Sequence, residues 1–174
     1  MGMRGFNIIL AVSVLALAIG CHTGGSATKK KQDKEASTLR LHVAVNPDES
    51  GRSMMVPIYR ESPTMVSVEK NPVLNEGDVA QAAVTNELGG FSILLQFNER
   101  GTKILEMTTV ANRDQRLAIF SQFGDARWLA APVMTQVITN GVLVFTPDAT
   151  RTEAERIVRG LNNVAAEMKK QNTF

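Results

Sequence analysis

Side chains that usually carry out chemistry are few in this chain of 174 residues, and they are scattered. There is one cysteine, Cys21, and there are two histidines, His22 and His42. A zinc site needs three or four cysteine, histidine or carboxylate ligands, and a catalytic triad needs a histidine beside a nucleophile and an acid. We expect His42 to lie in a strand and to face solvent, with no motif around it. We therefore expect no metal, no cofactor and no catalytic residue, and a protein that is not an enzyme.

The position of Cys21 gives the lone thiol another interpretation. It follows an apolar run, residues 8–19, which comes after a single positive charge at Arg4. The run is shorter than the roughly 20 residues that cross a bilayer, and it is typical of a secretory signal peptide. Residues 17–21, LAIGC, resemble the lipobox of bacterial lipoproteins, although alanine stands where a large aliphatic residue is usual.

In lipoproteins that cysteine is acylated and becomes the new N-terminus. The sequence therefore predicts a signal peptide over residues 1–20 and a lipid attached to Cys21. The alternatives are a chance cysteine in an ordinary signal peptide and a short membrane anchor.

Composition and charge narrow the function classes. The formal net charge is +2 at pH 7, without the clustered basic face that nucleic-acid binding requires, so we expect no nucleic-acid partner. A hydrophobic share of 44% is that of a globular protein, and the length fits one domain. Residues 21–37 are rich in Gly, Ser, Thr and Lys and show no apolar periodicity, which predicts a flexible linker.

Residues 38–174 are predicted to form a single α+β domain, with a largely antiparallel or mixed sheet and two main helices packed on it. Alternation of apolar and polar residues predicts the strands. They are expected at residues 38–45, 54–60, 64–69, 79–85, 91–97, 115–123 and 127–134. The glycine-containing loop at 86–90 predicts a hairpin, and Asn140-Gly141 predicts another between residues 137–138 and 142–145.

Both helices have start signals. Asn98 can accept a hydrogen bond from the first free backbone N–H groups of the helix that follows it. Thr150 and Glu153 form a capping box before the last helix. Gly160 interrupts the apolar stripe of that helix at a cost of about 1 kcal/mol relative to alanine, which a close contact with the sheet would explain.

Short pieces of sequence in a fixed order carry a family resemblance over about residues 64–164. They are Phe97-Asn98, Gly101, Thr108, Ala111-Asn112, Leu117-Ala118-Ile119, Ala131-Pro132-Val133, Gly141, Phe145-Thr146, Glu153-Ala154 and Leu161. In this order and spacing the span resembles the head subdomain of the first periplasmic domain of SecD, the protein-export membrane protein. We find neither that family's transmembrane helices nor its membrane-embedded acidic motif, and Asn140 stands where the family often has glycine. The resemblance implies the head fold and contact with extended polypeptide in export, but no translocation motor.

Arg127-Trp128 is the pair that we predict as a partner contact. Tryptophan and arginine are favoured anchors at interfaces, and Trp128 is the only tryptophan. The alternative is that Trp128 is a core residue.

The predicted function is a lipid-anchored interaction module of the bacterial cell envelope that faces the periplasm. Its partners are the membrane, through the lipid, and either unfolded polypeptide or another envelope protein, and it has no transport activity of its own. The alternative is a structural or scaffolding lipoprotein without a tight ligand. The outer membrane is favoured because His22, and not aspartate, follows Cys21.

Overall fold

The computed structural model describes residues 35–47 and 51–171. Cys21, His22 and the predicted signal peptide lie outside the described residues, as does most of the predicted linker. Within the described ranges, no helix is long and apolar enough to cross a membrane.

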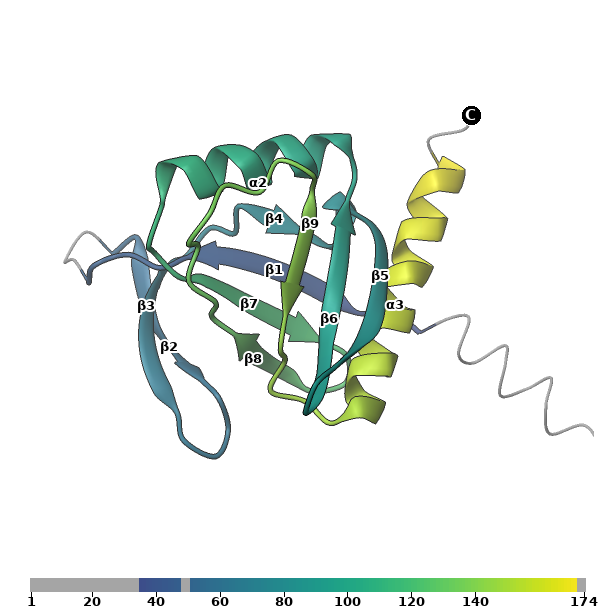
Figure 1. The fold of residues 1–174 in the computed structure, drawn as a ribbon, viewed down its shortest axis with the longest axis horizontal. Coiled ribbons are helices and arrows are strands. Elements are labelled where there is room, and N and C mark those ends of the chain that lie inside the picture. The colour runs from purple at the N-terminus through teal and green to yellow at the C-terminus, as the bar shows by residue number, and fades with distance from the viewer. Residues whose placement is uncertain (1–34, 48–50, 172–174) are drawn as a thin grey trace, which may run out of the picture.

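The described strands form three antiparallel sheets (Figure 1). The first sheet has the order β4-β1-β7-β8, with β1 (Thr38–Val43), β4 (Leu74–Asn75), β7 (Leu117–Gln122) and β8 (Ala126–Ala130). The second sheet has the order β5-β6-β9, with β5 (Val79–Glu87), β6 (Gly90–Phe97) and β9 (Val142–Phe145). The third is the β2–β3 hairpin, made of β2 (Ser53–Ile58) and β3 (Thr64–Glu69), which projects from one end of the domain.

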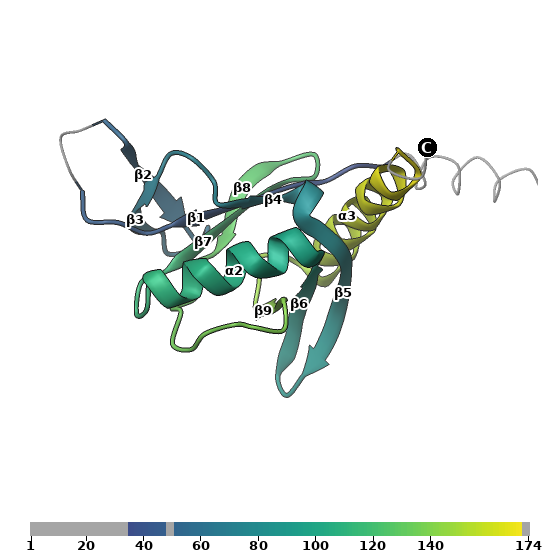
Figure 2. The same cartoon turned by 90° about the horizontal axis from the view of Figure 1, so that it is seen from above.

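Two helices flank the first and second sheets. Helix α2 (Glu99–Ala111) runs along one side of the space between the two sheets, and α3 (Arg151–Gln171) packs beside β5 (Figures 1 and 2). A short 3₁₀ turn, η1 (Glu76–Asp78), leads into β5. The predicted caps are confirmed, because Asn98 Oδ1 accepts the Gly101 N–H at 2.8 Å, and the Thr150 N–H donates to Glu153 Oε2 at 2.7 Å.

The main core lies between the first and second sheets, with both helices contributing to it. Burying one large aliphatic or aromatic side chain contributes about 1.5–3 kcal/mol, so this core is the main source of stability. Its fully buried members include Leu39, Leu41, Ile93, Leu95, Leu105, Ile119, Ile157 and Leu161. A smaller cluster lies on the other face of the first sheet, under the β2–β3 hairpin, and contains Val56, Ile58, Val68, Ala118 and Ala131.

The predicted α+β class, with antiparallel strands and two main helices, is confirmed, although the strands are divided among three sheets. The hairpin predicted around residues 86–90 is also confirmed. The hairpin predicted at Asn140-Gly141 is wrong. Gly141 has the expected positive φ of 68°, but residues 137–138 form no strand and β9 pairs with β6. The Ile138 N–H donates to Thr109 Oγ1 of α2 at 3.1 Å, which holds this stretch against the helix.

The first described residues are bound to α3, although the sequence assigned them to the linker. The Glu35 carboxylate lies between the guanidinium groups of Arg156 and Arg159, 2.9 Å from Nη2 of Arg159. Burial alone would raise the pKa of Glu35, but hydrogen bonds from the two arginines lower it below its ordinary value. The folded domain therefore includes Glu35.

Gly160 lies at the point where the same segment crosses α3. A Cβ atom at this position would sit 2.6 Å from the backbone nitrogen of Ser37, closer than atoms can approach. The glycine is therefore needed for a close contact, as its position suggests, and the contact is with the chain leading into β1.

Candidate functional site

The structure separates the two residues that were predicted as a partner contact. Successive side chains of a strand point to opposite faces, and Arg127 and Trp128 are neighbours in β8. Arg127 Nη2 lies 2.9 Å from Oε1 of Glu153, and its guanidinium carbon lies 5.0 Å from the ring centroid of Phe123. The Arg127 side chain is only 15% exposed, so it stabilises the junction of β8 with α3.

Trp128 lies on the outer face of the first sheet, away from the main core, and is partly exposed. Its ring packs edge-on against those of His42 and Phe120, with centroid distances of 5.1 and 5.4 Å. The three rings line a groove of about 290 Å³, which we call the Trp128 groove. Its other lining residues are Thr38, Arg40, Met54, Lys70 and Gln122. A partner contact through Trp128 stays a prediction.

The prediction that His42 faces solvent is wrong, because the residue is 4% exposed. The β2–β3 hairpin packs over this part of the sheet, and the His42 ring donates from Nδ1 to the carbonyl of Glu69 at 2.7 Å. Burial lowers the pKa of His42, so the ring is neutral at neutral pH. Among the described residues there is no cluster of three potential metal ligands around His42 or elsewhere.

A cluster of ion pairs surrounds the start of α3. Glu153 accepts a hydrogen bond from the Thr150 N–H and forms an ion pair with Arg127 at 2.9 Å, and Nη2 of Arg60 lies 3.7 Å from its Oε2. Arg60 also donates its backbone N–H to Oδ2 of Asp148 at 2.8 Å. These contacts connect the β2–β3 hairpin, β8 and α3, and their function is structural.

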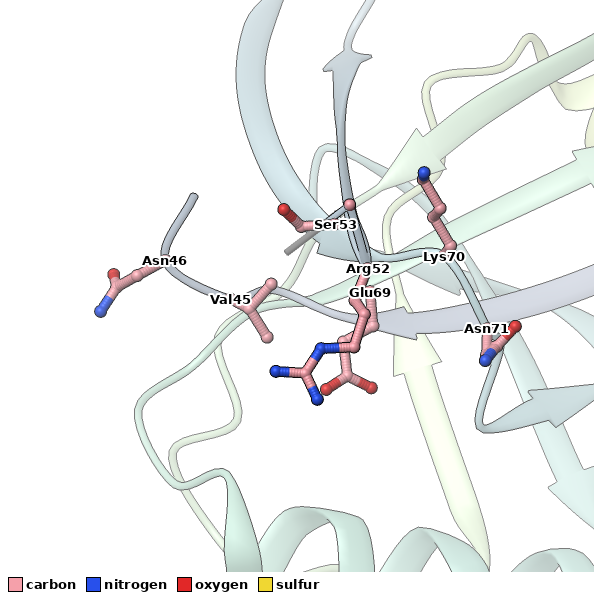
Figure 3. A pocket seen from close by; sticks show the side chains of 8 residues that line it. Val45, Asn46, Arg52, Ser53, Glu69, Lys70 and Asn71 are labelled. Carbon is pink, nitrogen blue, oxygen red and sulfur yellow. The ribbon is translucent and has the colours of Figure 1, made fainter. Parts of the chain in front are cut away.

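A polar pocket of about 530 Å³ lies where the β2–β3 hairpin meets the first sheet (Figure 3). In the close-up, Arg52 and Glu69 project to one side and Lys70 projects to the other. The lining mixes both signs of charge and contains neither cysteine nor histidine. We assign this pocket no function.

The outer edge of β9 has unpaired backbone groups. The Phe97 N–H donates to the Gly141 carbonyl at 2.9 Å, and the pairing of Leu95 with Leu143 continues this register. Hydrogen-bonded and non-hydrogen-bonded residue pairs alternate along an antiparallel pair of strands. Gly141 and Leu143 are at hydrogen-bonded positions, so the N–H and carbonyl of Val144 point away from β6. Among the described residues, neither the N–H nor the carbonyl of Val144 has a hydrogen-bond partner.

A second groove lies along this edge. It has a volume of about 400 Å³, and we call it the β9 groove. Its lining contains no charged side chain and comprises Leu117, residues 132–140 and residues 142–144. Three valines of this lining are well exposed, Val133 at 41%, Val137 at 42% and Val144 at 45%. Exposed apolar side chains beside unpaired strand groups are the features that an added strand recognises.

One sequence signal, the Asn140-Gly141 turn, bears directly on this site. Residues 137–138 were predicted to pair with residues 142–145, which would have covered the outer edge of β9. They are held against α2 instead, and the β9 groove lies between them and β9. The attachment of residues 137–138 to α2 therefore explains both the absence of the predicted hairpin and the presence of the groove.

Comparisons with known proteins give a consistent result. Residues 52–165 match the family described as the SecDF P1 head subdomain. No curated protein matches the chain. A solved structure described as SecDF, a membrane component that enhances protein export, is 22% identical, with a TM-score of 0.55 over 87% of this chain and 72% of that one.

A second structure, SecDF in a super-membrane-facing form, is also 22% identical, with a TM-score of 0.55 over 79% of this chain. The match covers 20% of that longer chain. At this identity the two structures show the shared fold. The family match spans well over half of the chain, and the protein therefore belongs to the SecDF P1 head subdomain family.

Proposed function

We propose that this protein is a lipid-anchored module of the bacterial envelope, facing the periplasm, that binds extended polypeptide during export. It has no transport or enzymatic activity of its own. The observation that carries the proposal is the open edge of β9 above an uncharged, valine-rich groove. Membership in the SecDF P1 head subdomain family supports the connection with export, since a relative of the same fold is described as enhancing it.

Strand addition is the binding mode that fits the β9 groove. An extended chain beside β9 would exchange hydrogen bonds with the N–H and carbonyl of Val144. Its side chains alternate, so every second one would lie in the groove against Val133 and Val137. Backbone hydrogen bonds give affinity without demanding one sequence, and the apolar lining selects apolar side chains. This combination suits a protein that meets many different unfolded chains.

The lipid anchor on Cys21 would keep the domain at the membrane surface. Cys21 lies 14 residues before Glu35, where the folded domain is clamped to α3. A fully extended segment of that length spans at most roughly 50 Å, so the domain would stay close to the bilayer. Of the two envelope membranes we favour the outer one, because His22 follows Cys21.

Intact mass of the protein extracted from membranes tests the anchor. We expect loss of residues 1–20 and a diacyl or triacyl addition on Cys21, and a Cys21→Ser variant that is no longer processed in this way. An unmodified cysteine would contradict the anchor. Separation of the two membranes on a density gradient would then decide between them.

Val144→Pro tests the binding site. Proline removes the N–H that faces the open edge, and β-edges tolerate proline, so the fold should keep its stability within about 0.5 kcal/mol. The probe is a fluorescent, reduced and carboxymethylated protein that cannot refold, and binding is measured by anisotropy. We expect Val144→Pro to bind it about tenfold more weakly, because one hydrogen bond is lost and a carbonyl of the probe is left unpaired.

Val144→Thr is the matched control, since it keeps the N–H and the branched shape, and it should bind like the native chain. Equal binding by the native chain and Val144→Pro would reject the β9 groove. Absence of any binding would reject the function and would leave the scaffolding alternative.

A further inference from the structure

The outer face of the first sheet carries a second candidate site, which is separate from the β9 groove. Strand pairing aligns Arg40 of β1 with Phe120 of β7, and Phe120 with Trp128 of β8. The three side chains therefore form one row across the sheet, on the face opposite the main core. The lining of the Trp128 groove includes no helix residue, so this row is covered by neither α2 nor α3.

The chemistry of the Trp128 groove is aromatic on the floor and basic at the rim. Phe120, Trp128 and the neutral His42 supply the rings. Arg40 and Lys70 are exposed, and neither side chain forms a hydrogen bond or an ion pair with a described residue. The lining contains no carboxylate that could neutralise them.

The absence of a counter-ion here contrasts with the ion pairs of the domain. Arg60, Arg100 and Arg127 are each paired with a carboxylate. Two unpaired cations above an aromatic floor are complementary to an anion attached to a flat apolar body. A volume of about 290 Å³ lies at the lower end for ligand pockets, and it suits one residue-sized group rather than a larger ligand.

We propose that the Trp128 groove binds the C-terminal residue of a polypeptide whose last side chain is aromatic or large aliphatic. The side chain packs on Phe120 and Trp128, and the terminal carboxylate lies between Arg40 and Lys70. Because Phe120 and Trp128 remain partly exposed, the groove is open on one side, and the rest of the polypeptide leaves through that side. The site is independent of Val144 and of strand addition.

Trp128 is itself the reporter, because it is the only tryptophan in the chain. The probes are a short peptide that ends in phenylalanine with a free carboxylate and the same peptide with an amidated end. We expect a saturable change in tryptophan fluorescence with the free acid and at least tenfold weaker binding of the amide. The Val144→Pro variant should bind the free acid as the native chain does, which separates this site from the β9 groove.

Variants assign the carboxylate contacts. Arg40→Gln should weaken binding of the free acid at least fivefold, and Gln122→Glu, which adds a negative charge to the lining, should weaken it more. Arg113→Gln changes an exposed cation outside the groove and should have no effect. Far-ultraviolet circular dichroism verifies that each variant is folded.

Three outcomes would overturn the proposal. They are equal binding of the acid and the amide, no saturable change in fluorescence at millimolar peptide, and an unchanged affinity in Arg40→Gln. N-acetylphenylalanine serves as a further probe. If it binds and the peptide acid does not, the groove takes small molecules and the proposal is wrong.

Discussion

The second sheet has one closed edge and one open edge. At β5, Asn162 of α3 pairs with both backbone groups of Ala82, accepting its N–H at 2.8 Å and donating to its carbonyl at 3.0 Å. At β9, the corresponding groups of Val144 have no partner among the described residues. A side-chain amide has the donor and acceptor of a peptide group, so Asn162 replaces a neighbouring strand at one residue.

This difference shows how the protein confines strand pairing to one place. Unprotected edge strands invite pairing with any other chain, and proteins commonly cover them with a helix or keep them short. The nine-residue β5 is covered by α3. The four-residue β9 is left open, beside a groove that limits what can approach it.

We expect the largest loss of stability from a substitution that removes the Asn162 amide from the edge of β5. Asn162→Leu leaves the N–H and carbonyl of Ala82 without partners, and we expect a loss of about 2–3 kcal/mol in the free energy of unfolding. The exposed edge should also promote self-association. Urea denaturation measures the first effect, and analytical ultracentrifugation across a concentration series measures the second.

Glu167→Leu is the matched control, because it adds the same side chain to an exposed position of α3. It should change stability by less than about 0.5 kcal/mol. The double variant Asn162→Leu with Val144→Pro should still self-associate. If Val144→Pro prevents the association, the new contacts form through β9, and the contrast between the two edges is wrong.

Local signals explain which parts of the fold could be predicted from the sequence. The capping box of Thr150 and Glu153 involves residues three positions apart, and it was predicted correctly. The hairpin at residues 86–90 is equally local. Asn162 gave no signal, because its partner Ala82 lies 80 positions away and an asparagine on a helix usually faces water.

Two of the wrong predictions have a shared physical cause, which is competition from a distant segment. His42 alternates with apolar neighbours as an exposed strand residue would, but the β2–β3 hairpin folds over it. Asn140-Gly141 has the best local turn chemistry in the chain, but Thr109 of α2 binds Ile138, which belongs to the predicted partner strand. The β9 groove exists because of that competition, so local sequence signals alone could not reveal it.

We expect a smaller loss of stability at acidic pH, because acid weakens the contacts that Glu153 makes at the start of α3. Burial alone would raise the pKa of Glu153, but the hydrogen bond from Thr150 and the nearby positive charge of Arg127 lower it to about 2 from an ordinary value of 4.5. A carboxyl group whose pKa is lower in the folded state stabilises the fold at pH values above its pKa in the unfolded state. This contribution is lost as the pH falls from about 4.5 to about 2. Because Glu153 is 25% exposed, we expect a contribution of about 1–2 kcal/mol.

Glu153→Gln measures this contribution directly. The difference in unfolding free energy between the native chain and this variant should be constant above about pH 5 and should shrink toward zero near pH 2. Taking the difference removes the similar acid response of Glu35, whose pKa is also lowered. Glu155→Gln, at an exposed position of the same helix, should show a much smaller difference at every pH. Hydrogen exchange shows whether Glu153 selectively holds α3 over the closed edge. If Glu153→Gln loosens the start of α3, exchange of the Ala82 N–H should accelerate while that of the Leu143 N–H stays unchanged. Equal acceleration at both strands would mean that Glu153 stabilises the whole domain instead.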